Sequence, residues 1–115
     1  MKSHTIHLHP EPYAVISSGR KTIESRLYDA KRQQIALGDQ LLFESRQDSS
    51  DTTAVRVTGL LRYQTFDALF MHNDPAKFGG SDAEALLVEI RQFYSAAEEA
   101  ENGVVGIVFE RSTSE

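Results

Sequence analysis

The sequence predicts an α+β fold in which a small, mostly antiparallel β-barrel carries flanking helices. Two observations support this fold class. Segments that alternate apolar and polar residues outnumber the helical segments, and turn-forming residues separate them. Their order is strand, helix, strand, strand meander, helices and a closing strand. We expect residues 1–115 to form a single domain, with a disordered tail at 112–115.

The first third of the chain predicts a strand, a helix and a second strand. Residues 4–9 alternate in polarity, as a half-buried strand does. Residues 10–18 have a proline where a first helical turn accepts one, and Gly19 stands where a helix ends in left-handed backbone. Residues 21–27 alternate again, so a strand follows the helix directly.

The middle of the chain predicts two neighbouring strands. A turn at Gly38-Asp39 leads into a strand at 40–44, a polar loop at 47–53 and a longer strand at 54–63. The glycine within the longer strand indicates a bulge or a close approach. Four of its residues are expected to share one face: Val55, Val57, Gly59 and Leu61.

The last part predicts two helices and the closing strand. Thr65 is placed as the N-cap of a short helix at 65–71. A capping box at Ser81–Glu84 predicts the start of a longer helix with a solvated acidic end. Residues 104–110 form the closing strand, which is free to pair with the first. The longer helix has an apolar stripe that suits a core or a pocket wall: Leu86, Leu87, Ile90, Phe93 and Tyr94. Its acidic end holds three glutamates: Glu98, Glu99 and Glu101.

Charge is distributed unevenly along the chain. The net charge is −5, but residues 1–62 hold nine Lys/Arg against seven Asp/Glu, whereas residues 63–115 hold three against ten. A general duplex binder carries a basic surface, so this balance favours a local basic cleft in the first half and a small or short ligand. No apolar run approaches the roughly 20 residues that span a bilayer, and the first residues lack the apolar region of a signal peptide.

Several kinds of site are not expected. The chain has no cysteine, which excludes disulfides, thiolate zinc sites and a cysteine nucleophile. His7 and His9 lie on one strand face, a spacing that can bind a metal, but a site needs three or four ligands and the sequence supplies no third nearby. We expect a solvated histidine pair, no metal, no cofactor, no membrane contact and a cytoplasmic location; the oligomeric state stays open.

Polar chemistry is concentrated at residues 19–27, GRKTIESRL. A strand here places Thr22, Glu24 and Arg26 on one face. Two interpretations follow. The glutamate and arginine form an exposed structural ion pair, which contributes at most about 1 kcal/mol, or they form a polar cluster directed into a cleft.

With its flanking segments, this stretch resembles the ASCH domain of the PUA-like superfamily. The shared motif is GxKxxExR, matched here by Gly19, Lys21, Glu24 and Arg26. The Gly-Asp turn and strand that follow are also similar to the family, as are a YQTF segment before the short helix, a tyrosine at the end of the next helix, and the glutamate and GVV segment beyond it. The resemblance covers about residues 4–110.

This resemblance implies a β-barrel with a cleft beside a helix, lined by the motif. Members of the family are associated with RNA or nucleotides, and some are hydrolases. The resemblance implies Lys21 and Glu24 as catalytic residues if turnover occurs. The ligand-binding set combines the motif with cations, a hydroxyl and aromatic residues nearby: Arg20, Lys21, Thr22, Glu24, Arg26, Tyr63, Phe66 and Tyr94.

Three functions are consistent with these residues. In the first, the cleft binds RNA, a nucleotide or a nucleoside through the cations and a stacking ring. In the second, the protein hydrolyses a modified nucleoside or RNA, as an amidohydrolase or a ribonuclease. One branch of the resembled family deacetylates acetylcytidine with a threonine three residues after the lysine, where this chain has Glu24; we therefore expect little deacetylation. In the third, the chain is a non-catalytic interaction scaffold.

Overall fold

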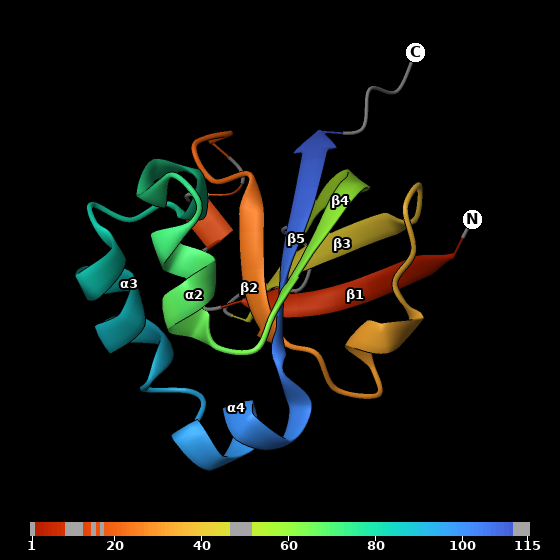
Figure 1. The fold of residues 1–115 in the computed structure, drawn as a ribbon. Helices are drawn as coiled ribbons and strands as arrows, with labels where there is room; N and C mark the ends of the chain where they lie inside the picture. The colour runs from red at the N-terminus through yellow and green to blue at the C-terminus, as the bar shows by residue number, and fades with distance from the viewer. Residues whose placement is uncertain (1, 9–12, 15, 17, 47–51, 112–115) are drawn as a thin grey trace.

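The protein is described by a computed structural model, which covers residues 2–8, 13, 14, 16, 18–46 and 52–111. A curled five-stranded sheet lies at its centre, with helices along one side and at one end (Figure 1). The strands are β1 Ser3–Leu8, β2 Ile23–Leu27, β3 Gln40–Ser45, β4 Thr52–Tyr63 and β5 Val104–Arg111. The helices with described bounds are α2 Phe66–Met71, α3 Ala83–Ile90 and α4 Ala96–Asn102, with 3₁₀ turns η1 Arg32–Gln34 and η2 Pro75–Phe78.

The five predicted strands are all present, and the α+β half-barrel with flanking helices confirms the predicted fold class. Of the helix expected at 10–18, four residues are described: Tyr13, Ala14 and Ile16 are helical, and Ser18 lies in a turn. Gly19 follows in left-handed backbone with φ 84°, as predicted for a helix end. Most of the polar loop expected at 47–53 lies outside the described residues, but Thr52 and Thr53 already belong to β4.

The sheet order is β1-β3-β4-β5-β2. Three of the four pairings are antiparallel, and β1 runs parallel to β3. The first and last strands, which the sequence left free to pair, therefore do not pair with each other in the described part of the chain. Because β4 and β2 occupy both edges of β5, β1 pairs along the outer edge of β3 instead. The sheet curls but does not close between β1 and β2, and this open seam positions the cavity described below.

A bulge in β4 changes which residues share a face. The register against β5 shifts between Val57 and Gly59, and a Cβ on the glycine would lie 3.2 Å from the Val108 side chain, so both predicted features of Gly59 are present. An extra residue reverses the alternation beyond it. As a result Leu60, not Leu61, joins Val57 in the core inside the curl, and Leu61 packs on the opposite face.

Two apolar cores cover the two faces of the sheet. Strand β5 contributes to both, because alternate residues point to opposite sides. The core inside the curl receives Val105, Ile107 and Phe109, which alternate along the strand. The core between the sheet and the helices is formed chiefly by Ile23, Leu27, Phe66, Leu69, Phe70, Phe78, Leu86 and Val104. Among the described residues no helix is long and apolar enough to cross a membrane.

The helical segment predicted to start at Ser81 is two helices. The N-cap of α3 is Asp82, whose carboxylate accepts a hydrogen bond from the Ala85 amide at 2.8 Å. After α3 ends, the chain forms a capping box at Ser95 and Glu98 and begins α4. The predicted capping box at Ser81–Glu84 is therefore wrong, whereas the predicted N-cap Thr65 accepts from the Ala68 amide at 3.1 Å.

Glu99 is also not part of a solvated acidic end. It is 6% exposed, and its carboxylate accepts hydrogen bonds from the Phe66 amide at 2.8 Å and from Arg91 at 3.0 Å. The amide belongs to the first turn of α2, where a negative charge stabilises the helix. The carboxylate therefore joins α4 to the start of α2 and to the end of α3.

Ser95→Ala is expected to lower the free energy of unfolding by about 1 kcal/mol, since it removes a hydroxyl that caps a helix. Ser81→Ala is the matched control and should change stability by less than about 0.5 kcal/mol, as exposed substitutions usually do. Urea unfolding followed by circular dichroism measures both. An equal loss for the two variants would contradict the placement of the capping box.

Candidate functional site

A cavity of about 150 Å³ lies at the open seam of the sheet. His7 and Leu8 at the end of β1 line one side, and residues 21–26 on and before β2 line the other. Helix α3 and the segment after it complete the wall. The apolar lining comes mainly from the core under the helices: Phe70, Phe78, Leu86 and Ile90.

The predicted motif residues Lys21, Glu24 and Arg26 meet in this cavity. The Lys21 ammonium lies 2.6 Å from Glu24 Oε1 as an ion pair, and Arg26 Nε donates to Glu24 Oε2 at 2.7 Å. Glu24 is 3% exposed, and the two cationic side chains are about 15% exposed. The cluster is therefore a buried carboxylate held between two cations, not an exposed ion pair.

Local backbone contacts fix the start of β2 and with it the cluster. The Thr22 amide donates to the Lys77 carbonyl at 2.8 Å, and the Thr22 carbonyl accepts from the Phe109 amide at 3.0 Å. Alternation then turns Ile23 and Leu27 into the core under the helices, while Glu24 and Arg26 bond to each other. The sequence forms the site here because one strand presents apolar and charged residues in alternation.

The two cations keep the carboxylate ionised. Burial raises the pKa of Glu24, but the Lys21 ammonium and the Arg26 guanidinium more than offset burial and lower that pKa to about 2. Burial lowers the pKa of Arg26, but the charges of Glu24 and Tyr94 and the hydrogen bonds to them together outweigh burial and raise it. Glu24 is thus an anionic hydrogen-bond acceptor at neutral pH, suited to orienting other groups and poorly suited to donating a proton.

Tyr94, a member of the predicted ligand-binding set, lies next to the cluster. Its hydroxyl accepts a long hydrogen bond from Arg26 Nη1 at 3.4 Å, and its ring stacks on Phe66 at 5.8 Å between centroids. Phe66 itself is completely buried and does not line the cavity. The structure therefore places Phe66 beneath the aromatic wall, where it supports Tyr94 and is covered by it.

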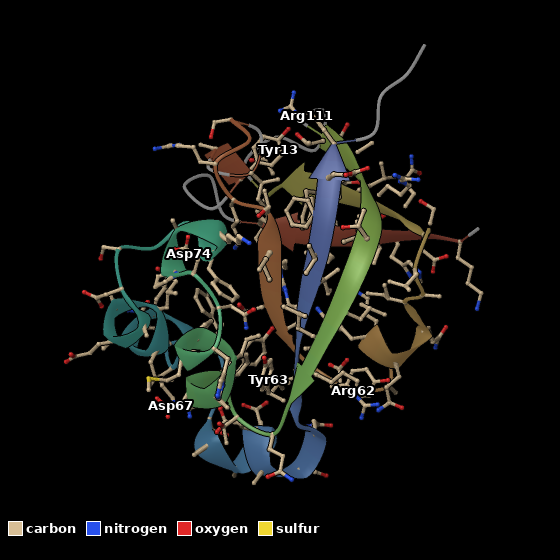
Figure 2. The ribbon with its side chains drawn as sticks, turned by 45° about the horizontal axis from the view of Figure 1, so that its top comes forward. Tyr13, Arg62, Tyr63, Asp67, Asp74 and Arg111 are labelled. Carbon is tan, nitrogen blue, oxygen red and sulfur yellow. The ribbon has the colours of Figure 1, made fainter. Side chains whose placement is uncertain are left out.

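Three other residues of the predicted set lie outside this cavity. Tyr63 stacks on His72 at 5.7 Å and lines a separate hollow together with Arg62. Figure 2 shows Tyr63 and Arg62 at the end of the sheet next to α4. Arg20 is exposed, and its Nε donates to Ser18 Oγ at 3.1 Å. Thr22 is half-buried beside the cluster but does not line the cavity.

Ten of the fourteen described lining residues were not predicted as site residues, and two of them, Arg46 and Phe93, bear directly on ligand binding. Arg46 is exposed just after β3, and reaches the cavity because β3 pairs with β1. Phe93 is 54% exposed and follows α3 at the cavity. Its place in the apolar stripe was a sequence signal for a core or a pocket wall, whereas Arg46 carries no local signal and depends on sheet topology.

In the described residues, the N-terminal histidines are not grouped as metal ligands. His7 Nδ1 lies 3.7 Å from Glu44, and His4 Nε2 lies 2.9 Å from the buried Asp39. His9 lies outside the described residues. Within the described part of the chain, no three His, Cys, Asp or Glu side chains are grouped to hold a metal ion.

Comparisons with known proteins agree on one family. The ASCH domain model matches residues 6–112. The crystal structure of hypothetical protein PH0355 is 33% identical, with a TM-score of 0.83, 97% of this chain covered and 100% of that one. Protein PF0455 from Pyrococcus furiosus is 28% identical, with a TM-score of 0.73 and 99% and 100% coverage.

A more distant structure shares the fold. The ASCH protein from Zymomonas mobilis is 17% identical, with a TM-score of 0.66, 95% of this chain covered and 67% of that one. No curated protein matches this chain.

Proposed function

This chain belongs to the ASCH domain family, and from that premise we propose that it binds RNA or a nucleotide in the seam cavity. The observation that carries the proposal is the buried Lys21–Glu24–Arg26 cluster in the cavity wall. A carboxylate held between two cations presents fixed polar groups beside an apolar pocket. Binding sites for small ligands combine these two properties.

The charges of the residues that line the cavity favour an anionic ligand, whereas the net charge of the whole chain does not. Its lining holds three cations, Lys21, Arg26 and Arg46, against two carboxylates, Glu24 and Glu89, although the chain carries −5 overall. Arg46 is exposed, so its guanidinium is accessible to a phosphate, which it can bind through two hydrogen bonds. The protein would therefore bind a short nucleic acid segment, with one phosphate held by Arg46.

Aromatic residues supply the second element of nucleotide recognition. Tyr94 and Phe93 are consecutive and both line the cavity. Stacking of a base on an aromatic ring contributes about 1–3 kcal/mol and tolerates any sequence. A base inserted beside these rings would leave its sugar and phosphate outside, toward Arg46.

Binding is favoured over hydrolysis by the state of Glu24. A catalytic acid or base works best when its pKa is near the working pH, whereas the pKa of Glu24 is lowered to about 2. Lys21 is engaged with this carboxylate at 2.6 Å, so it would have to leave it before it could act as a base. The cluster is better arranged to orient a ligand than to transfer a proton.

Arg46→Ala is expected to weaken binding of a fluorescent single-stranded hexanucleotide about tenfold, which corresponds to the loss of one charge-assisted contact. The slope of log affinity against log salt should become shallower by about 0.7, as for one fewer phosphate contact on a single strand. Fluorescence anisotropy at several salt concentrations measures both.

The matched control is Arg56→Ala, which removes an exposed arginine that pairs with Glu110 on the sheet and does not line the cavity. Its affinity should equal that of the wild type. The proposal fails if neither variant changes the affinity, or if both change it equally. Release of cytidine from acetylcytidine by the wild type would instead favour the hydrolase function.

A further inference from the structure

We propose that the cavity selects uracil over the other bases by reading its imide edge; this inference rests on the proposed function. The observation behind it is the order of hydrogen-bonding groups in the Lys21–Glu24–Arg26 cluster. The carboxylate lies between the two cations, with contacts of 2.6 and 2.7 Å. The cavity wall therefore presents a donor, an acceptor and a donor in sequence.

This order is fixed by charge. Lysine and arginine side chains only donate hydrogen bonds, and an ionised carboxylate only accepts them. A glutamine or asparagine in the middle position could rotate its amide, and could therefore either donate a hydrogen bond to a base or accept one from it. Because Glu24 is held ionised between the cations, its role as an acceptor does not change at physiological pH.

Uracil carries the complementary edge. Its ring nitrogen N3 bears a hydrogen and lies between two carbonyl oxygens, so the edge runs acceptor, donor, acceptor. N3–H would donate to Glu24, and the carbonyl oxygens would accept from Lys21 and Arg26. Cytosine places an unprotonated ring nitrogen against the carboxylate and an amino group against a cation, and both contacts are repulsive.

Cavity size favours a single ring. The cavity measures about 150 Å³, and a buried cavity of that volume accommodates benzene. One six-membered ring therefore fills it well, and a purine would occupy it less favourably. The apolar walls contributed by Phe70, Phe78 and Ile90 suit the faces of a single ring.

One oxygen of the cluster has unused capacity for this contact. Glu24 Oε1 is buried, and its close partner among the described residues is the Lys21 ammonium at 2.6 Å, which leaves a further lone pair of this oxygen unused. Buried acceptors are nearly always hydrogen-bonded. The lysine has a flexible stem with three donors, so its ammonium can move onto a ligand carbonyl and leave this oxygen to accept N3–H.

Calorimetric titration of the wild type with UMP, CMP and AMP tests the selectivity. UMP should bind at least about tenfold more tightly than CMP, because a matched base edge is worth about 1–3 kcal/mol of discrimination. AMP should bind more weakly than UMP. The decisive probe is N3-methyl-UMP, which has the same phosphate but no N3–H, and its affinity should fall at least as far as that of CMP.

A variant provides an independent test. Glu24→Gln should lose the preference for UMP over CMP, since the amide can donate to the cytosine ring nitrogen. Equal binding of UMP, CMP and N3-methyl-UMP to the wild type overturns the uracil inference but leaves nucleotide binding intact. Absence of binding by every mononucleotide and by the hexanucleotide overturns both proposals.

Discussion

Arg26→Ala is expected to lower the free energy of unfolding by about 3–5 kcal/mol. Removing one partner of a buried ion pair leaves the other charge buried and only partly compensated. Glu24 is 3% exposed, and the variant leaves it with Lys21 alone. Urea unfolding at neutral pH measures the loss, which is a large share of the 5–15 kcal/mol that stabilises a typical domain.

Two further variants separate burial from charge. Arg56→Ala removes an arginine whose pair with Glu110 is more than half exposed, and it should cost at most about 1 kcal/mol. Arg26→Lys keeps the charge but loses the planar guanidinium, so its stability should fall between the wild type and Arg26→Ala. Equal, small losses for the two alanine variants would show that the cluster contributes no more than a surface pair.

The sequence alone indicated a weaker structural role for this cluster. Alternation at 21–27 correctly placed Glu24 and Arg26 together, but it does not tell whether a polar face meets solvent or a closed cleft. That depends on β1, α3 and η2, which come together from both ends of the chain. If the cluster were an exposed pair, a change at Arg26 would affect binding and leave stability nearly unchanged; its burial makes both change.

The fold was predictable where local pattern decides the structure. All five strands follow from alternation, and the cap at Thr65 and the left-handed turns at Gly19 and Gly38 follow from side-chain chemistry. Errors arose where neighbouring residues compete for one role. Ser81 and Asp82 are both good caps, and the structure uses the aspartate. The pairing of β1 with β3 has no local signal at all.

The sequence predicted the candidate site where its residues are close together in the chain, and missed it where strand pairing brings them together. Lys21, Glu24 and Arg26 lie within six residues of each other, so one strand brings them together. Tyr94, four residues after α3, joins them because it packs on the same core as α3. Arg46 depends on strand pairing. Tyr63, the last residue of β4, lines a different hollow. Its aromatic character alone does not determine on which side of the molecule its ring lies.

Stability is expected to fall steeply as the pH is lowered from about 5 to about 2. The pKa of Glu24 is about 2 in the folded protein against an ordinary value of 4.5. A lowered pKa contributes stability that is present above the unfolded pKa and is lost as the pH falls through the folded one. Each pKa unit is worth 1.36 kcal/mol, so the Glu24 contribution amounts to about 3 kcal/mol.

Asp39 adds to the same acid sensitivity. Hydrogen bonds from His4 and from the Lys2 and Ala36 amides lower the pKa of Asp39 to about 2. Its carboxylate therefore also loses folded-state contacts when it is protonated. This contribution of Asp39 to the loss of stability in acid remains when Glu24 is replaced. The two contributions are separable because Glu24 lies in β2 and Asp39 in the turn before β3, and the two carboxylates share no partner among the described residues.

Comparison of the wild type with Glu24→Gln isolates the Glu24 contribution. Glutamine does not titrate, so the variant should show a shallower decline in unfolding free energy between about pH 5 and about pH 2. The gap between the two proteins should be widest near neutral pH and should close as the wild-type carboxylate becomes protonated, because a neutral carboxyl and an amide are then nearly equivalent partners for the two cations. Urea unfolding across this pH range measures the gap. Curves that stay parallel down to about pH 2 would mean that Glu24 is not held ionised by Lys21 and Arg26, and the electrostatic basis of the site would be wrong.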